Sequence, residues 1–90
     1  MSSNPNITKP DNVQLGISAQ GVLFWNGEVV EKAEMQRRLR SAARLKPQPE
    51  LHLRADRATH YQLLAEVMAE AAQAGLTRIG FVSEPNRERP

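Results

Sequence analysis

Ninety residues allow a single domain with a modest core, which oligomerisation would help to stabilise. Twelve basic residues nearly balance ten acidic ones, and a net charge of +2 is too small to indicate nucleic-acid binding. The absence of cysteine excludes disulfides, thiolate catalysis and cysteine-based zinc sites.

The chain opens on a segment without a regular apolar pattern. Ser, Asn and Pro are frequent in residues 1–12, which we expect to form a flexible linker without a signal peptide. The longest apolar run, Val22–Trp25, is far too short to span a membrane. We therefore expect any transmembrane segment of the protein to lie outside these residues.

A β-hairpin is predicted next. Val13, Leu15 and Ile17 alternate with polar or small residues, which is typical of a half-buried strand. Gln20-Gly21 forms the turn, and Val22–Trp25 forms a second short strand.

The segment after the hairpin predicts a turn and then a helix. Asn26-Gly27 is the strongest turn signal in the chain, and Val29-Val30 either returns briefly as a strand or leads into the helix. Apolar residues recur at helical spacing over residues 31–45, and Pro47 prevents continuation. The inward-facing residues of this helix are Met35, Leu39 and Ala42 or Ala43.

The opposite face of this helix is rich in arginine. Such a face could bind lipid headgroups or an acidic partner. A solvated face with intrahelical pairs such as Glu34–Arg38 is the simpler interpretation, and we favour it.

Residues 50–84 predict a compact βαβ unit. Leu51 and Leu53 alternate with polar residues as a strand, and Thr59 with Gln62 matches a capping box. Gly75 stands where a helix ends in a left-handed residue, before a final strand. The helix is expected to bury Tyr61, Leu64, Val67 or Met68, and Ala71; the final strand contains Ile79, Phe81 and Val82.

These elements predict an α/β fold in the order β-β-α-β-α-β. Right-handed crossovers would place both helices on one face of a mixed sheet of four or five strands, giving a two-layer sandwich. The domain is predicted over residues 13–84, with a flexible tail over 85–90. The second sheet face would stay polar or meet another copy of the chain.

The sequence offers no convincing chemistry. His52, Asp56 and His60 are spaced by four, but a turn between strand and helix breaks the helical register, so we expect no metal site. Asp56 is better interpreted as a turn residue than as a general base. A small α/β enzyme would need convergent polar groups in a pocket, and no such set is visible. We expect no catalytic residues and no cofactor.

The second half resembles a known family. The segments that carry the resemblance are Leu53-Arg54-Ala55-Asp56, Tyr61-Gln62-Leu63-Leu64, Val67-Met68, Ala74-Gly75 and Arg78-Ile79-Gly80-Phe81-Val82. Together with the earlier hairpin, they resemble the periplasmic domain of the ExbD/TolR family, and more closely ExbD.

This resemblance implies a function. It implies the periplasmic domain of a single-pass inner-membrane protein that works with a pentameric ExbB-like membrane subunit. The complex would use proton flow to energise TonB for uptake of siderophores, haem or vitamin B12. The alternative is a TolR-like module that binds peptidoglycan or Tol partners. The proton-responsive carboxylate would lie in a transmembrane helix absent from this sequence.

The resemblance also directs the choice of partner-binding residues. We expect a homodimer that binds the periplasmic part of TonB at the dimer cleft and at an unpaired sheet edge. The strand from Val13 to Ile17 is our candidate for that edge; its simple pairing with Val22–Trp25 is the alternative. Trp25 is either a core residue, which we favour, or an exposed contact. The predicted contacts are Val13, Gln14, Leu15, Gly16, Ile17, Trp25, Asp56, Phe81 and Val82.

Overall fold

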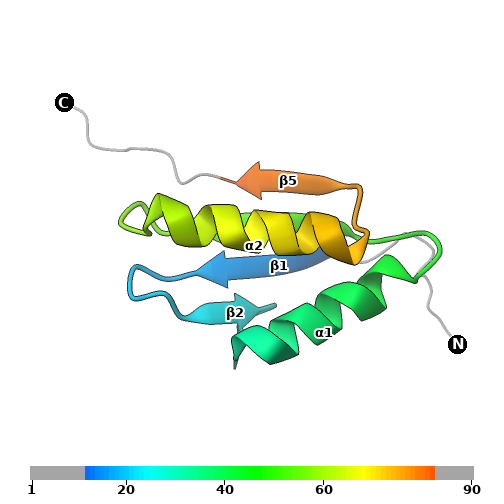
Figure 1. The fold of residues 1–90 in the computed structure, drawn as a ribbon, viewed down its shortest axis with the longest axis horizontal. Helices are drawn as coiled ribbons and strands as arrows, with labels where there is room; N and C mark the ends of the chain where they lie inside the picture. The colour runs from blue at the N-terminus through cyan, green and yellow to red at the C-terminus, as the bar shows by residue number, and fades with distance from the viewer. Residues whose placement is uncertain (1–11, 83–90) are drawn as a thin grey trace, which may run out of the picture.

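The computed structural model describes residues 12–82 as a five-stranded mixed sheet with two helices packed on one face (Figure 1). The predicted two-layer α/β fold is confirmed, and Val29-Val30 belongs to an additional strand. The predicted linker, apart from Asn12, and the predicted tail lie outside the described residues. The elements are β1 (Asn12–Ile17), β2 (Leu23–Trp25), β3 (Glu28–Val30), α1 (Lys32–Ala43), β4 (Glu50–Ala55), α2 (Tyr61–Ala74) and β5 (Ile79–Val82).

The strand order corrects one expectation. The sheet runs β3-β2-β1-β4-β5, with β1, β4 and β5 parallel and β2 antiparallel to both of its neighbours. The prediction that Val13–Ile17 forms a sheet edge is wrong. The hairpin occupies one side of β1, and the crossover through α1 returns β4 to the other side. Strand addition at β1 is therefore blocked on both sides.

The core lies between the sheet and the two helices. Leu15 and Leu53 of the sheet and Met35 and Leu39 of α1 are each 0% exposed, and no described polar side chain is buried between the layers. The buried side chains are Val13, Leu15, Ile17, Leu23, Val30, Met35, Leu39, Ala42, Leu51, Leu53, Val67, Ala71 and Leu76.

The start of α2 differs from the sequence expectation. Tyr61 is 79% exposed, because the inward face of α2 centres on Val67 and Ala71 and position 61 points to the side. The predicted capping box is also wrong. The Thr59 hydroxyl donates instead to the carbonyl oxygens of Ile17 and Ser18, at 3.2 and 3.3 Å. This contact attaches the turn before α2 to the end of β1.

Gln48 joins the loops at one end of the molecule. Its Nε2 donates to the carbonyl oxygens of Ala43 and Gly75, each at 2.9 Å. Its Oε1 accepts from the backbone N–H and the hydroxyl of Thr77, at 3.1 and 3.2 Å. One side chain therefore satisfies backbone groups at the C-terminal ends of both helices and in the loop before β5. Gly75 has φ 109° there, which confirms the predicted left-handed helix end.

The Asn26-Gly27 turn also bonds to a strand outside its own hairpin. Asn26 and Gly27 have φ of 50° and 90°, as a tight turn between β2 and β3 requires. The Asn26 N–H donates to the carbonyl oxygen of Gln14 at 2.7 Å, and its side-chain Oδ1 accepts from the N–H of Gln14 at 2.8 Å. Asn26 thus extends the β1–β2 ladder by one residue.

The first prediction concerns Gln48. Replacing Gln48 with Ala removes four hydrogen bonds and should lower the free energy of unfolding by about 1–3 kcal/mol. Gln48→Glu should cost at least as much, because a carboxylate would face two carbonyl oxygens. Chemical denaturation measures both, with Gln62→Ala on the exposed side of α2 as the control. An effect of Gln48→Ala no larger than that of the control would contradict the assignment.

The second prediction separates the two roles of Asn26. Asn26→Gly keeps the positive φ but loses the acceptor for Gln14, so its cost should be about 1 kcal/mol. Asn26→Ala loses the acceptor and also strains the backbone, so it should cost more. Asn26→Asp keeps an acceptor and tolerates this φ, and should be the mildest of the three. The order Asp, Gly, Ala in thermal or urea unfolding is the expected result; equal losses would refute it.

Candidate functional site

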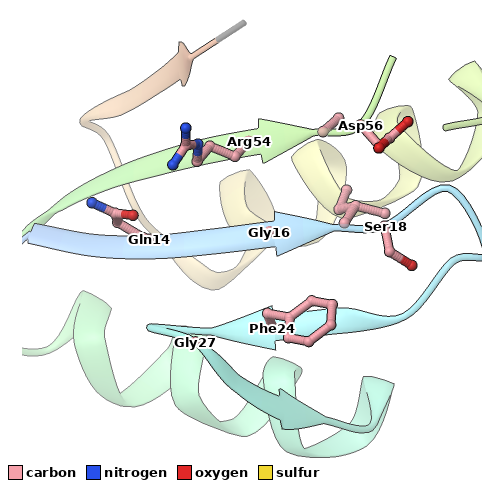
Figure 2. A pocket seen from close by; sticks show the side chains of 9 residues that line it. Gln14, Gly16, Ser18, Phe24, Gly27, Arg54 and Asp56 are labelled. Carbon is pink, nitrogen blue, oxygen red and sulfur yellow. The ribbon is translucent and has the colours of Figure 1, made fainter. Parts of the chain in front are cut away.

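The sheet face opposite the helices, called here the open face, carries a shallow hollow. Strand alternation places Gln14, Gly16, Phe24 and Arg54 on this face, where Gly16 is paired with both Phe24 and Arg54. No described helix covers it. The hollow has a volume of about 330 Å³. Its lining residues are Gln14, Gly16, Ile17, Ser18, Phe24, Gly27, Arg54, Ala55 and Asp56 (Figure 2).

Gly16 gives this hollow its shape. Phe24 and Arg54 lie on either side of it (Figure 2). A Cβ at position 16 would meet the Cβ of Phe24 at 3.7 Å and the carbonyl oxygen of Arg54 at 3.8 Å, so the position has room that glycine leaves empty. An aromatic ring, a guanidinium group and an amide therefore surround a strip of bare backbone. Such a surface can contact a ligand, but it contains no activated nucleophile.

Asp56 holds the turn beside the hollow. Its Oδ1 accepts from the backbone N–H of Ala58 at 2.8 Å, and its carbonyl oxygen accepts from the N–H of Thr59 at 2.9 Å. Its own N–H donates to Ile17 at 2.9 Å. These bonds confirm the interpretation of Asp56 as a turn residue. Within residues 12–82, no three His, Asp or Glu side chains are grouped so that they could hold a metal ion.

A charged cluster lies on the open face where β4 and β5 begin. His52 Nε2 and Glu50 Oε1 are 3.0 Å apart, and Arg78 donates to Glu50 Oε2 at 3.1 Å. The hydrogen bond with His52 and the charge of Arg78 hold the pKa of the Glu50 carboxyl below its ordinary value of 4.5. The cluster ties the start of β5 to β4.

The outer edge of β5 is the second candidate surface. Among the described strands β5 pairs only with β4, so its other side has no neighbouring strand (Figure 1). Phe81 is 51% exposed on the helix side of the sheet, and Val82 is 40% exposed on the open face. A hollow of about 220 Å³ lies beside Phe81. It is lined by Ala55, Asp56, Arg57, Thr59, Tyr61, Leu64 and Phe81.

The structure divides the predicted contact residues into three groups. Gln14, Gly16 and Asp56 line the open-face hollow, while Phe81 and Val82 lie on the outer edge of β5. The other residues belong to the core or its border: Val13, Leu15 and Ile17 are buried, and Trp25 packs against the core. The guanidinium carbon of Arg38 lies 6.0 Å from the centre of the Trp25 ring. Trp25 is therefore half-buried at the border of the core.

Sequence reasoning missed three residues of these surfaces. Phe24 and Arg54 could have been placed on the open face, because each follows a buried residue in an alternating strand. Tyr61 was assigned to the core on apolar character, although its helical position relative to Val67 points sideways.

The ion pairs generate a prediction about acid stability. Hydrogen bonds from Arg37 and then Arg38 lower the pKa of Glu34, as His52 and Arg78 do for Glu50. Both carboxyls therefore stabilise the fold above pH 4.5, their ordinary pKa, and lose this contribution as pH falls through the lowered values.

The check is thermal unfolding of a Glu34→Gln/Glu50→Gln variant along an acid series. Below pH 4.5 its stability should change less steeply than that of the parent. Glu31→Gln is the control, because Glu31 has no ion-pair partner among residues 12–82. If the stability of the double variant and of the parent fell equally steeply with pH, these ion pairs would not account for the loss of stability in acid.

Comparison with known proteins identifies a family. The model of the family described as biopolymer transport protein ExbD/TolR matches residues 1–86. The biopolymer transport protein exbD1 of Xanthomonas campestris pv. campestris is 37% identical over 71 residues, covering 79% of this chain and 51% of the relative. ExbD2 of the same species is 31% identical, covering 87% of the chain and 60% of the relative. ExbD of Neisseria gonorrhoeae is 34% identical, with coverages of 82% and 54%.

The match has a defined extent. The chain spans 51–60% of the length of these relatives. Within residues 12–82, no helix has the length and apolar character needed to cross a membrane. The stretch matched by the family model includes every described strand and helix, and on this evidence the chain belongs to the ExbD/TolR family of biopolymer transport proteins.

Proposed function

We propose that this chain is the periplasmic, non-enzymatic domain of an ExbD subunit in a proton-driven TonB–ExbB–ExbD complex. In this proposal it dimerises and binds an extended periplasmic segment of TonB, in support of siderophore, haem or vitamin B12 uptake. Contacts with the ExbB-like subunit would belong to a transmembrane segment of the protein. Membership of the ExbD/TolR family supports the proposed complex. The proposed binding of a TonB segment is supported by the outer edge of β5, which has no neighbour among the described strands.

The backbone of β5 is suited to strand addition. A strand with one unpaired side offers a row of N–H and C=O groups to an extended peptide. Side chains of the added strand would alternate between the two sheet faces. On the helix side they would reach Phe81 and the hollow of about 220 Å³, which can receive an apolar side chain. On the open face they would meet Val82, which is 40% exposed.

The opposite edge of the sheet is less suitable. β3 is three residues long and leads into α1 after one residue. Glu28, on the helix side of β3, is already bonded to Arg38 at 3.0 Å. Val29 is 62% exposed on the open face, where it is paired with Phe24, a residue that lines the hollow of about 330 Å³. The edge of β3 is therefore the shorter one and is engaged by an ion pair on its helix side, whereas β5 offers exposed Phe81 beside a hollow on that side.

A second copy of the chain could use the surface next to this edge. Tyr61, Met68 and Phe81 are exposed on α2 and β5, at 79%, 41% and 51%. Pairing of two copies along this surface would bury apolar area that a domain of this size otherwise leaves in water. The proposed dimer would then place its cleft beside the peptide-binding edge.

The test is NMR titration of the isotope-labelled chain with peptides from the periplasmic region of TonB. Amides of residues 79–82 and of the turn before α2 should shift, and Phe81→Ser should weaken binding at least tenfold, about 1.4 kcal/mol. Val29→Ser on β3 is the matched control and should bind like the parent. A scrambled peptide controls for composition.

Two results would overturn the edge assignment. One is a set of shifts on β3 or the open face with residues 79–82 unchanged. The other is equal affinity of the Phe81→Ser and Val29→Ser variants. Sedimentation of the same variants reports the dimer separately, because loss of dimerisation with retained peptide binding would assign the two roles to different surfaces.

A further inference from the structure

The arginines of α1 divide into two groups by their ion pairs. Arg37 and Arg38 are paired with Glu34, and Arg38 also with Glu28. Arg40 and Arg44 are exposed, and no described carboxylate lies within ion-pair distance of either. The solvated-face interpretation therefore fits the first group. The second group leaves positive charge toward the C-terminal end of the helix that no described carboxylate pairs with, although Glu70 lines the same shallow hollow as Arg40.

Two more residues extend this charge beyond the helix. Lys46 is exposed and likewise has no described carboxylate partner. Leu45, between Arg44 and Lys46 in the chain, is 57% exposed. We call Arg40, Arg44, Leu45 and Lys46 the basic end. It combines three cations with an exposed leucine that lies between two of them in the chain.

The basic end lies where the described chain begins. The loop after α1 leads directly into β4, whose first residue Glu50 is paired with Asn12, the first residue of β1. The last turn of α1 and the starts of β1 and β5 lie toward the same end of the molecule (Figure 1). Glu50, the first residue of β4, is already paired with His52 and Arg78.

We propose that the basic end docks the domain on an anionic lipid surface. Cations that flank an exposed leucine suit the boundary between headgroups and acyl chains, where charge and apolar surface are satisfied together. An acidic protein segment would satisfy the cations but leave Leu45 in water. This inference rests on the proposed function only for the membrane anchor, which would hold the domain near the bilayer.

The expected affinity is low and suits a tethered domain. Each cation near an anionic surface contributes about fivefold to partitioning, so three contribute on the order of 100-fold. A free domain would bind such a surface weakly. A tether raises the effective concentration of the domain at the bilayer, so weak contacts become occupied and stay reversible.

The experiment is co-sedimentation of the 90-residue chain with vesicles of phosphatidylethanolamine and phosphatidylglycerol, compared with phosphatidylcholine. Binding should require the anionic lipid and weaken with salt. The variant Arg40→Gln/Arg44→Gln/Lys46→Gln should lose at least 20-fold in partitioning. The control Lys32→Gln/Arg37→Gln/Arg57→Gln removes the same charge elsewhere and should lose less than fivefold. Leu45→Ser, with no change of charge, should lose about threefold.

Each outcome decides the proposal. Equal losses in the two triple variants would show diffuse charge attraction and overturn a localised site. Unchanged binding of Leu45→Ser, with polyglutamate displacing the vesicles, would assign the surface to an acidic protein instead. Bicelle titration of the parent, with broadening expected at residues 44–46, does not depend on variant folding.

The result is independent of the TonB test. The basic-end triple variant should bind TonB peptides like the parent, because residues 79–82 are unchanged. Vesicle binding without peptide binding would refute the proposed function and keep the lipid surface. Peptide binding without vesicle binding would refute the lipid surface and keep the proposed function.

Discussion

The parallel pairing of β1 with β4 is the contact on which the rest of the molecule depends. Six residue pairs run from Asn12 with Glu50 to Ile17 with Ala55. The pairing aligns the buried side chains of both strands under the helices and puts Gly16 beside Arg54 on the open face. At its end, Ile17 accepts bonds from both Asp56 and Thr59, which positions the turn before α2. A one-residue shift would turn every one of these side chains to the wrong face.

This pairing also determines which surfaces remain for partners. With β1 enclosed, the sheet can be extended only at β3 or β5. Both helices cover the same face, so the other face is left with a hollow above Gly16 (Figure 2). The described residues therefore present three surfaces: the outer edge of β5, the open face, which adjoins that edge at Ala55 and Asp56, and the basic end of α1. None of these three described surfaces combines a nucleophile with a positioned base.

The proposed surfaces lie at different ends of the sheet. β5 runs parallel to β4, so it starts near the basic end and carries Phe81 and Val82 toward the other end. A domain resting on a bilayer through α1 would hold this part of β5 away from the lipid. Membrane contact and peptide binding could then occur together, since neither uses the other's residues. The hydrogen bonds of Gln48 link the helix ends with the loop before β5 and help to keep this geometry rigid.

Local patterns in the sequence were sufficient for the elements, the two-layer class and the family, because alternation, helical spacing and turn residues act over a few positions. The turn at Asn26-Gly27 and the helix end at Gly75 could be predicted from the sequence for this reason. The position of β1, the pairing of Arg38 with Glu28 and the partner of the Thr59 hydroxyl were decided by tertiary structure. Each depends on a residue distant in the chain: β4 closes the free side of β1, Glu28 on β3 takes Arg38, and Ile17 takes the Thr59 hydroxyl from the helix cap. No short segment encodes which distant residue wins such a competition. For this reason the sequence predicted a sheet edge at β1, whereas the structure has edge strands at β3 and β5.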